Sequence, residues 1–384
     1  MFINFWYPAV ASDALKDQPV KVRMLGQHFV VFRDSAGVAH CLSNVCTHRG
    51  GNLAGGRIHG DCIACPYHGW RFNGAGECVK IPSLGPVDGV PGGKIPARTR
   101  IDAYPVQEKY GLVFAFLGDL PEAERPPILE IKEWGQPGWR TTLQHWVWDI
   151  DYKRSIENGI DSAHNEFVHP THGFSGARED YQLNEPEMWT DDWGTGIRNK
   201  RLAPPLKDEK MREASGRDDN AVVESATGHH GCAQVWTHIH PTPTMFIHQY
   251  LFECPIDAGR TSIYLVNMRN FLPTPDHDAR MMERNQVVAF QDRDVLVEVE
   301  PKITPRTMTK ESFVIHDKPI ARYRQWLDEW ERRGWRIDTD AVEANRANTA
   351  YAIPSPGRRQ HKAWVMDPVP LLPGAVQKAK AAAE

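Results

Sequence analysis

The chain has 384 residues, of which 41% are hydrophobic and 24% charged, and its 45 basic and 49 acidic residues give a formal net charge of −4. This length predicts about two or three domains, and the lack of a basic excess argues against nucleic acid as the main partner. No run approaches the roughly 18–20 consecutive apolar residues of a membrane span, and no basic segment follows the first residue. We therefore expect a cytoplasmic protein that acts neither on nucleic acid nor in a membrane.

The first third of the chain has the pattern of short β-strands separated by turns. Strand-like runs rich in apolar and β-branched residues lie at residues 20–25, 28–33, 38–42 and 111–117. Turn-like segments rich in glycine and asparagine or aspartate lie at 34–37 and 73–76. A proline-rich stretch at 121–137 predicts a linker. Residues 1–120 are therefore predicted to form an all-β domain.

Residues 121–384 are predicted to form a second domain that mixes helices and strands. We expect a helix over 151–167 that ends before Pro170, then polar loops over 175–230. An antiparallel meander is predicted from β-like runs at 232–240, 244–253 and 261–271. Helical periodicity is present at 279–299 and 318–333. With a frayed helix at 376–384, the predicted fold class is α+β.

Two Cys-His pairs lie close together in the first domain. Cys46-Thr-His48 is followed, after sixteen residues, by Cys65-Pro-Tyr-His68. Two loops that fold toward each other would bring these four side chains onto a metal, and an odd cysteine count favours a metal site over disulfides. A structural zinc site is one interpretation of this set. The other three cysteines of the region are expected to be packed or surface thiols: Cys41, Cys62 and Cys78.

The surroundings of these ligands carry a family resemblance. Cys-x-His-Arg-Gly together with Cys-Pro-Tyr-His-Gly-Trp resembles the [2Fe–2S] motif of Rieske non-haem iron oxygenases. The resemblance assigns Cys46 and Cys65 to one iron and His48 and His68 to the other. The glycines beside the ligands would let backbone amides approach the cluster.

A second set of metal-binding residue types lies in the predicted helix. Glu157, Asp161 and His164 are spaced to share one helical face, whereas His169 lies about 140° round the helix from His164. The helix must therefore bend or stop before both imidazoles can reach one metal, and Pro170 is placed to stop it. Two histidines and one distant carboxylate can hold Fe(II) and leave positions open for dioxygen and substrate.

The third ligand is expected in the helix over 279–299, at Asp292 or Asp294. Asp292 shares its predicted helical face with Val288 and Val295, whereas Asp294 lies about 200° away beside Gln291, which predicts a solvated position. The Gln-Asp dipeptide also resembles the acidic ligand position of the family. Asp292 is therefore preferred.

Asp161 is interpreted as a partner of the iron ligands. It is placed to accept a hydrogen bond from His164 and to fix the tautomer of that imidazole. By resemblance it would also bridge to His68 of a neighbouring subunit, which requires a ring of three subunits.

The resemblance implies a terminal oxygenase of two domains. The Rieske domain would be residues 1–120, with cluster loops at 46–68, and residues 121–384 would form a helix-grip catalytic domain, an antiparallel sheet wrapped round a long helix. The implied cofactors are the [2Fe–2S] cluster and a mononuclear Fe(II), with O2 as co-substrate. Electrons would come from NAD(P)H through a separate ferredoxin or reductase, because the chain lacks a dinucleotide-binding glycine fingerprint.

The substrate and the reaction type stay open from the sequence. Trp236, Met245, Ile247 and Leu251 suit an aromatic, heteroaromatic or polycyclic substrate, and they suit a sheet core equally well. Residues 104–119 resemble the oxygenases with a single large subunit, among them carbazole-type and steroid-hydroxylating members. Monohydroxylation, dihydroxylation and demethylation all occur in that group.

Other interpretations belong to different classes of protein. His238, His240 and His248 on the β-like runs would either line the substrate cavity or form a polar part of the core. A Rieske electron-transfer protein with a non-catalytic binding domain would have no second iron. A zinc-stabilised binding module would be colourless.

Overall fold

The computed structural model describes residues 1–86, 91–172, 174–179, 181–202 and 222–375. The chain forms two compact units, one of residues 1–128, 254–257 and 330–384 and the other of residues 129–253 and 258–329. The predicted boundary near residue 120, between a cluster domain and a catalytic domain, stays a prediction. Residues 330–384 belong to the first unit. No helix in the described part of the chain is long and apolar enough to cross a bilayer.

The first unit is dominated by three antiparallel sheets, which confirms the predicted all-β organisation of the N-terminal part. The strand orders are β1-β11-β10, β2-β3-β4-β9 and β5-β6-β7-β8. The strands are β1 (Phe5–Ala11), β2 (Val20–Met24), β3 (Gln27–Arg33), β4 (Ala39–Ser43), β5 (Arg57–His59), β6 (Cys62–Ala64), β7 (Arg71–Asn73), β8 (Cys78–Lys80), β9 (Ala103–Tyr104), β10 (Val106–Lys109) and β11 (Leu112–Leu117). The C-terminal segment adds α6 (Thr339–Asn345), α7 (Gly357–Gln360) and the parallel pair β19 (Tyr351–Ala352) and β20 (Asp367–Pro368).

Burial explains the strand pattern of this unit. All six residues of β11 are buried, because the strand lies between β1 and β10 and is covered on both faces. A second core contains Val30, Phe32 and Leu42 of the neighbouring sheet together with Cys46 and Cys65. The two predicted cluster cysteines are therefore part of a packed core.

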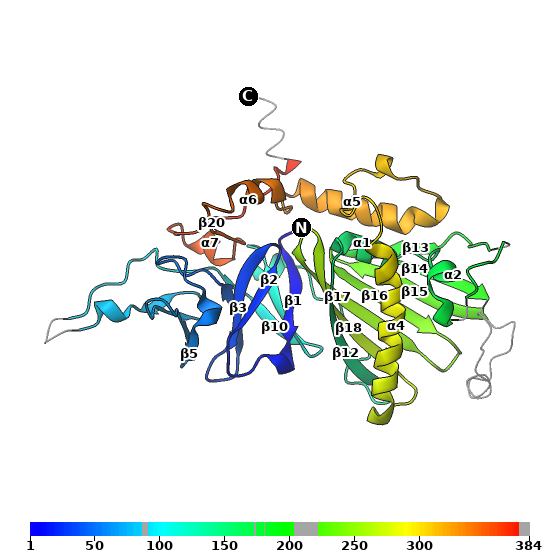
Figure 1. Cartoon of the computed structure of the whole chain (residues 1–384), viewed down its shortest axis with the longest axis horizontal. Coiled ribbons are helices and arrows are strands. Elements are labelled where there is room, and N and C mark those ends of the chain that lie inside the picture. Colours follow the sequence, from blue (N-terminus) through cyan, green and yellow to red (C-terminus); the bar gives the residue numbers. More distant parts are fainter. Residues whose placement is uncertain (87–90, 173, 180, 203–221, 376–384) are drawn as a thin grey trace. The chain divides into compact units, whose positions relative to one another are not determined.

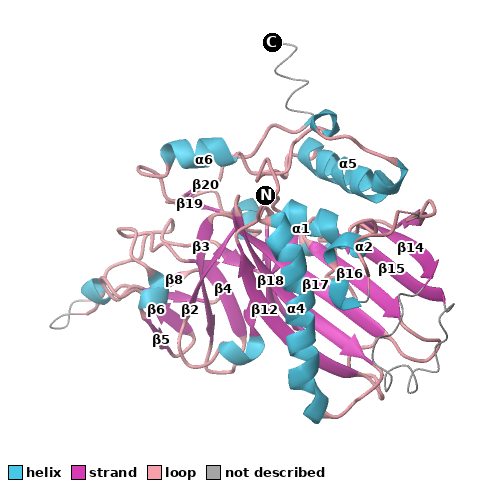
Figure 2. Ribbon diagram, turned by 45° about the vertical axis from the view of Figure 1, so that its right-hand side comes forward, coloured by secondary structure: helices cyan, strands magenta, loops and turns pink. Residues whose placement is uncertain are grey.

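The second unit is a seven-stranded antiparallel sheet with a long helix, α4 (Asp278–Leu296), lying across it (Figure 1; Figure 2). The strand order is β12-β18-β17-β16-β15-β14-β13. The strands are β12 (Arg140–Trp148), β13 (Glu187–Thr190), β14 (Gly194–Leu202), β15 (Val222–His230), β16 (Gln234–His240), β17 (Ile247–Asp257) and β18 (Arg260–Arg269). The other helices are α1 (Tyr152–Gly159), α2 (Asn165–Val168) and α5 (Lys318–Arg332). The helix-grip prediction is confirmed.

The two faces of this sheet differ in what covers them. Leu251 of β17 and Phe290 of α4 pack against the same core cluster, so the side chain of Leu251 lies on the face toward that helix, here called the inner face. Side chains alternate along a strand, which places Ile247 and Gln249 on the inner face and His248 on the opposite, outer face.

Two predicted elements differ from the structure. Residues 175–230 were expected to be loops, yet β13, β14 and β15 lie within them. Some of their charged side chains lie on the outer face, such as Arg198, which pairs with Glu224 of the neighbouring strand at 3.3 Å. The helix expected over 151–167 is divided into α1 and α2. Residues 203–221 and the predicted helix at 376–384 lie outside the described residues.

Candidate functional site

Two loops of the first unit present the predicted cluster ligands in matching conformations. In each loop a glycine N–H donates to the carbonyl of the cysteine four residues earlier, Gly50 to Cys46 and Gly69 to Cys65, both at 2.9 Å. Both glycines have positive φ, 69° and 71°, a conformation that costs glycine little. Each cysteine N–H donates in return to the carbonyl five residues onward, at 2.9 and 2.8 Å. The repeated Cys-to-Gly spacing therefore produces two similar turns.

The two predicted cysteine ligands are more deeply buried than the two predicted histidine ligands. Cys46 and Cys65 are buried, at 2% and 3% exposure, and burial raises the pKa of the Cys46 thiol to about 12. His48 and His68 lie nearer the surface, with their Nδ1 atoms 3.1 Å apart. Two thiols on the inside and two imidazoles on the outside are the donor set that a Rieske cluster requires.

The space around the sulfurs also fits a cluster. A Cβ atom at Gly51 would lie 2.7 Å from Cys65 Sγ and 3.7 Å from Cys46 Cβ, so a side chain there would occupy the position beside the thiols. Cys41, Cys62 and Cys78 lie on strands rather than in the two loops.

In the second unit, the break between α1 and α2 positions the predicted iron ligands. His164 is the N-cap of α2 and His169 is its C-cap, so the two imidazoles flank a single helical turn. Asp161 creates the break, because its carboxylate accepts the backbone N–H of Ala163 at 2.7 Å and of His164 at 3.1 Å. Aspartate often starts a helical turn in this way.

The structure brings His164, His169 and Asp292 together. The two histidine Nε2 atoms are 3.3 Å apart, and Asp292 Oδ1 lies 3.3 Å from that of His169 and 3.6 Å from that of His164. These ligand atoms form one of the groups able to hold a metal among the described residues. Asp294 instead is exposed and pairs with Arg293 at 2.6 Å.

The hydrogen bonds around this triangle assign its protons. His164 Nδ1 lies 3.3 Å from Asp161 Oδ2, and His169 Nδ1 lies 3.1 Å from Gln291 Oε1. Both partners are acceptors, so each Nδ1 carries the hydrogen and each Nε2 presents a lone pair. Asp292 Oδ1 is buried and has no hydrogen-bond partner in the described structure. Three electron-rich atoms that face one another without a donor fit a bound cation.

Asp161 has the charge that its predicted role needs. Burial disfavours its ionised form, but the hydrogen bond from His164 and the two backbone N–H groups outweigh burial and lower the pKa of Asp161. The carboxylate can therefore remain ionised while it accepts the His164 hydrogen.

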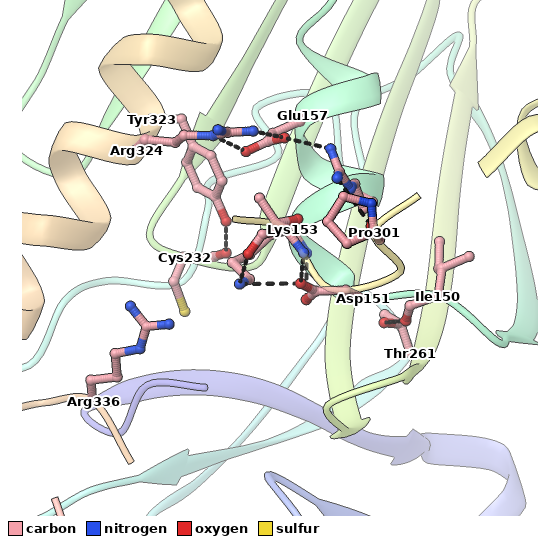
Figure 3. A network of polar contacts seen from close by, with 12 residues as sticks. Ile150, Asp151, Lys153, Glu157, Cys232, Thr261, Pro301, Tyr323, Arg324 and Arg336 are labelled. Atoms are coloured by element: carbon pink, nitrogen blue, oxygen red, sulfur yellow. Dashed lines mark hydrogen bonds and ion pairs between the residues drawn. The ribbon is translucent and has the colours of Figure 1, made fainter. Parts of the chain in front are cut away.

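Polar contacts anchor α1 ahead of this turn (Figure 3). Glu157 receives two hydrogen bonds from Arg324, at 2.7 and 2.8 Å, and Arg154 Nη2 donates to Pro301 O at 3.1 Å. Asp151 caps the start of the helix through the N–H of Lys153. Glu157 is thus used in a buried ion pair, although the sequence placed it on one face with the iron ligands.

The other metal-capable group lies on the outer face of the sheet and comprises Glu133, His238 and His248. The rings of His238 and His248 stack with their centroids 3.8 Å apart. The lone pairs of stacked rings lie in nearly parallel planes, so one ion cannot lie on the lone-pair axis of a nitrogen of each ring, as coordination requires. Glu133 instead accepts hydrogen bonds from His248 Nδ1 and Tyr250, both at 2.8 Å, which outweigh burial and lower the pKa of Glu133 to about 2.

Sequence reasoning missed Gln291 and left the position of Trp236 open. Gln291 was expected in solvent but accepts hydrogen bonds from His169 and from Thr171 Oγ1, the latter at 3.0 Å. Its position next to Asp292 was the only signal. Trp236 pairs with Tyr250 and lies on the outer face, whereas Ile247 and Leu251 are on the inner face. The histidines at 238, 240 and 248 are also on the outer face.

Two family comparisons cover most of the chain. Residues 5–96 match the Rieske [2Fe-2S] domain, and residues 148–333 match the vanillate O-demethylase oxygenase C-terminal domain. Each match contains one of the two ligand sets described above.

Curated relatives match parts of the chain of different length. The chain is 38% identical over 182 residues to cholesterol 7-desaturase nvd 1 of Ciona intestinalis, covering 46% of this chain and 37% of that protein. It is 35% identical over 173 residues to the toluene-4-sulfonate monooxygenase system iron-sulfur subunit TsaM1 of Comamonas testosteroni, covering 44% and 48%. The chain thus spans less than half the length of these two relatives. Methylxanthine N1-demethylase NdmA of Pseudomonas putida is 25% identical over 341 residues, 85% of this chain and 88% of NdmA.

Solved structures share the fold. Pseudomonas putida NdmA with caffeine aligns with a TM-score of 0.72 at 22% identity, covering 86% of this chain and 91% of that one. Dicamba monooxygenase bound to dicamba aligns with a TM-score of 0.68 at 21% identity, covering 86% and 97%.

Proposed function

Because the chain belongs to the Rieske non-haem iron oxygenases, we propose that it is the terminal oxygenase component of a multi-protein system. Residues 1–120 would carry the [2Fe–2S] cluster on Cys46, His48, Cys65 and His68. Residues 121–384 would carry a mononuclear iron on His164, His169 and Asp292. The reaction would be an O2-dependent oxidation of a small organic substrate.

One observation carries this proposal. The three atoms that face one another in the second unit have lone pairs and no donor between them, in a chain that also presents two thiols and two imidazoles in matching loops. A structural zinc protein needs only one such site. An electron-transfer protein needs no second iron, so the intact triangle favours an oxygenase.

The residues have separate tasks in this reaction. When bound, the cluster supplies electrons one at a time and the mononuclear Fe(II) activates dioxygen. Asp161 and Gln291 hold the Nδ1 hydrogens of His164 and His169, which keeps both Nε2 lone pairs directed inward. His164, His169 and Asp292 would hold the metal with two imidazoles and one carboxylate, a ligand set that would leave positions for dioxygen and substrate.

The remaining partners are part of the proposal. Electrons would come from NAD(P)H through a separate ferredoxin or reductase, and the chain would work as a homotrimer in the cytoplasm, where Asp161 of one subunit approaches His68 of the next. The name of the Comamonas relative describes an iron–sulfur subunit within a monooxygenase system, which supports separate electron-transfer proteins.

The test combines metal analysis with product analysis. Purified protein should be brown-red and contain about three irons and two sulfides per chain, the sum of a [2Fe–2S] cluster and one mononuclear iron. Incubation with NADH, a compatible reductase and a panel of aromatic, heteroaromatic and steroid compounds should give an oxygenated or demethylated product. Colourless protein would support the zinc interpretation, and two irons without turnover would support an electron-transfer protein.

A further inference from the structure

A cavity in the first unit lies where the chain leaves one sheet for another. Tyr104 of β9 pairs with Cys41 of β4, and this register would place Pro105 opposite His40. Pairing with β4 stops at this point, and from Val106 onward the chain pairs with β11 instead. The two strands therefore separate next to His40.

The cavity at this separation has a volume of about 310 Å³ and is open to solvent. Its lining includes His40, Gly74, Tyr104, Pro105, Val106 and Pro356. Liquid water takes about 30 Å³ per molecule, so the cavity has room for about ten heavy atoms. A compound with one or two rings fits that size.

Hydrogen bonds fix the wall that comes from the C-terminal segment. Ser355, which precedes Pro356, donates through Oγ to Asp102 at 2.7 Å, and Arg358 donates two hydrogen bonds to the same carboxylate, both at 2.8 Å. Asp102 is fully buried. Tyr104 Oη donates to a backbone carbonyl of the same segment at 2.7 Å. The shape of the cavity is therefore set by buried hydrogen bonds.

His40 brings a hydrogen-bond acceptor to the cavity. Its Nε2 lies 2.8 Å from Asp34 Oδ2. Hydrogen bonds from His40 and from two backbone N–H groups outweigh burial and lower the pKa of Asp34. An ionised carboxylate can only accept, so the hydrogen of the neutral imidazole lies on Nε2 and the lone pair lies on Nδ1.

The Nδ1 atom of His40 is free and accessible. It makes no hydrogen bond within the described residues, and the side chain is 23% exposed. Buried polar atoms without a partner occur elsewhere in the described chain, but Nδ1 is not one of them. A Cβ atom at Gly74 would collide with the imidazole next to Nδ1, so the glycine keeps that side of the ring clear of a side chain.

The charges around the cavity favour an uncharged ligand. No lysine or arginine is among the described residues that line it, so a carboxylate or sulfonate would lack a counter-ion. The Asp34 carboxylate is bound at Nε2, the other nitrogen of the His40 ring, so it does not face a cation at Nδ1. An O–H group, in contrast, needs only the Nδ1 lone pair.

We propose that this cavity binds a small uncharged ring compound whose O–H group donates to His40 Nδ1, which is the chemistry of a phenol. The side chains of Pro105, Val106 and Pro356 pack against the ring of the ligand. All lining residues belong to the first unit, whereas the three proposed iron ligands belong to the second. The cavity is therefore a second site, and it goes beyond the proposed oxidation.

Four naphthalene derivatives test the ligand chemistry in isothermal titration calorimetry of the purified holoprotein at neutral pH. The probe 2-naphthol offers an uncharged O–H group, 2-methoxynaphthalene lacks it, 2-naphthoate is an anion and 2-naphthylmethylamine is a cation. The naphthol should bind about fivefold to tenfold more tightly than its methyl ether, because the ether cannot donate the hydrogen bond. Equal affinities, binding of none of the probes, or a preference for either ion would overturn the proposal.

Two variants assign the contact to this cavity. His40→Leu removes the acceptor and should reduce the preference for the naphthol to about twofold or less, with little change for the methyl ether. Val106→Trp fills the cavity and should weaken binding of both about tenfold or more. His59→Leu is the matched control, because His59 is an exposed histidine of the same unit outside the cavity. It should keep the wild-type affinities, and a preference that survives His40→Leu would overturn the proposal.

Hydrogen–deuterium exchange of the wild-type protein locates the ligand without a variant. Saturating 2-naphthol should slow amide exchange in peptides that cover residues 101–110 and 351–360. Protection confined to residues 129–253 and 258–329 would mean that the naphthol binds in the second unit, with the proposed iron ligands, and would overturn the proposal. Neither outcome depends on whether the protein oxidises a substrate.

Discussion

Gln291 offers a direct test of how the second metal site is held. Its Oε1 accepts the hydrogen of His169 Nδ1 at 3.1 Å and that of Thr171 Oγ1 at 3.0 Å. Gln291→Leu removes this acceptor with little change in side-chain size. The imidazole can then place its hydrogen on Nε2, where it blocks coordination.

The expected loss follows from that single contact. Removing the outer partner of a metal-binding histidine typically lowers metal affinity about 10–100-fold, which corresponds to about 1.4–2.7 kcal/mol. Gln291→Glu keeps an acceptor oxygen at the same position and should retain iron at nearly the wild-type level. Gln286→Leu, at an exposed position of the same helix, should have no effect.

The assay is equilibrium dialysis of the purified protein against a series of concentrations of an Fe(II) chelator. Total iron per chain reports the mononuclear site, and visible absorption reports the cluster as an internal standard. Gln291→Leu should release about one iron per chain at chelator concentrations that leave the wild type loaded, with unchanged absorption. The reasoning is refuted if Gln291→Leu and wild type release iron at the same chelator concentration, or if Gln286→Leu releases it equally early.

Four further outcomes are expected. Cys46→Ser should lose the visible absorption. His164→Ala should lose one iron per chain and keep the visible absorption, and loss of absorption in both variants would contradict two independent centres. Asp161→Asn should retain the mononuclear iron and normal reduction of the cluster, but its turnover should be more than about 100-fold slower than that of the wild type. This loss is larger than the loss usually seen when the hydrogen-bond partner of a metal ligand is removed. Wild-type turnover would remove Asp161 from the electron path. Arg324→Met removes the ion-pair partner of the buried Glu157 carboxylate and should lower the free energy of unfolding by about 3–5 kcal/mol. Arg322→Met, at a partly exposed ion pair, should lower it by less than about 1 kcal/mol. Equal losses in urea unfolding would count against this difference. Burial raises the pKa of Glu253 from 4.5 to about 8, although a hydrogen bond from Ser155 acts in the opposite direction. The folded state therefore holds an extra proton between these pH values, and the free energy of unfolding should fall by about 1.4 kcal/mol per pH unit as the pH rises. Glu253→Gln should flatten this slope in urea unfolding at pH 5–8, and an unchanged slope would contradict the prediction.

Much of the fold could be predicted because burial leaves a periodic signal. The strand-like runs at 20–25 and 28–33 correspond to β2 and β3, and the predicted helix at 279–299 corresponds to α4. β14 and β15 were missed because their outward residues are charged, and cross-strand pairs such as Arg198 with Glu224 look like loop polarity in a sequence. Pairing between strands that are distant in the sequence aligns those charged side chains on one face of the sheet.

The residues that would bind the metal were easier to predict than the residues that hydrogen-bond to them. The spacing of His164 and His169 required a bend, and the structure has one. Asp292 was chosen partly because Val295 was expected on the same buried face, but Val295 is 49% exposed, and the residues that share the inward side of α4 with Asp292 include Asn285. Gln291 could not be identified, because its partners Thr171 and His169 lie more than 100 residues away.

The twin turns of the cluster loops bear on how the holoprotein is assembled. Each turn closes through its own backbone hydrogen bonds, Gly50 to Cys46 and Gly69 to Cys65, and the strands on either side are already paired. Zinc fingers, in contrast, fold only when metal arrives. Here both loops have backbone hydrogen bonds of their own, so bonds to a cluster are not the sole source of order in the ligand set.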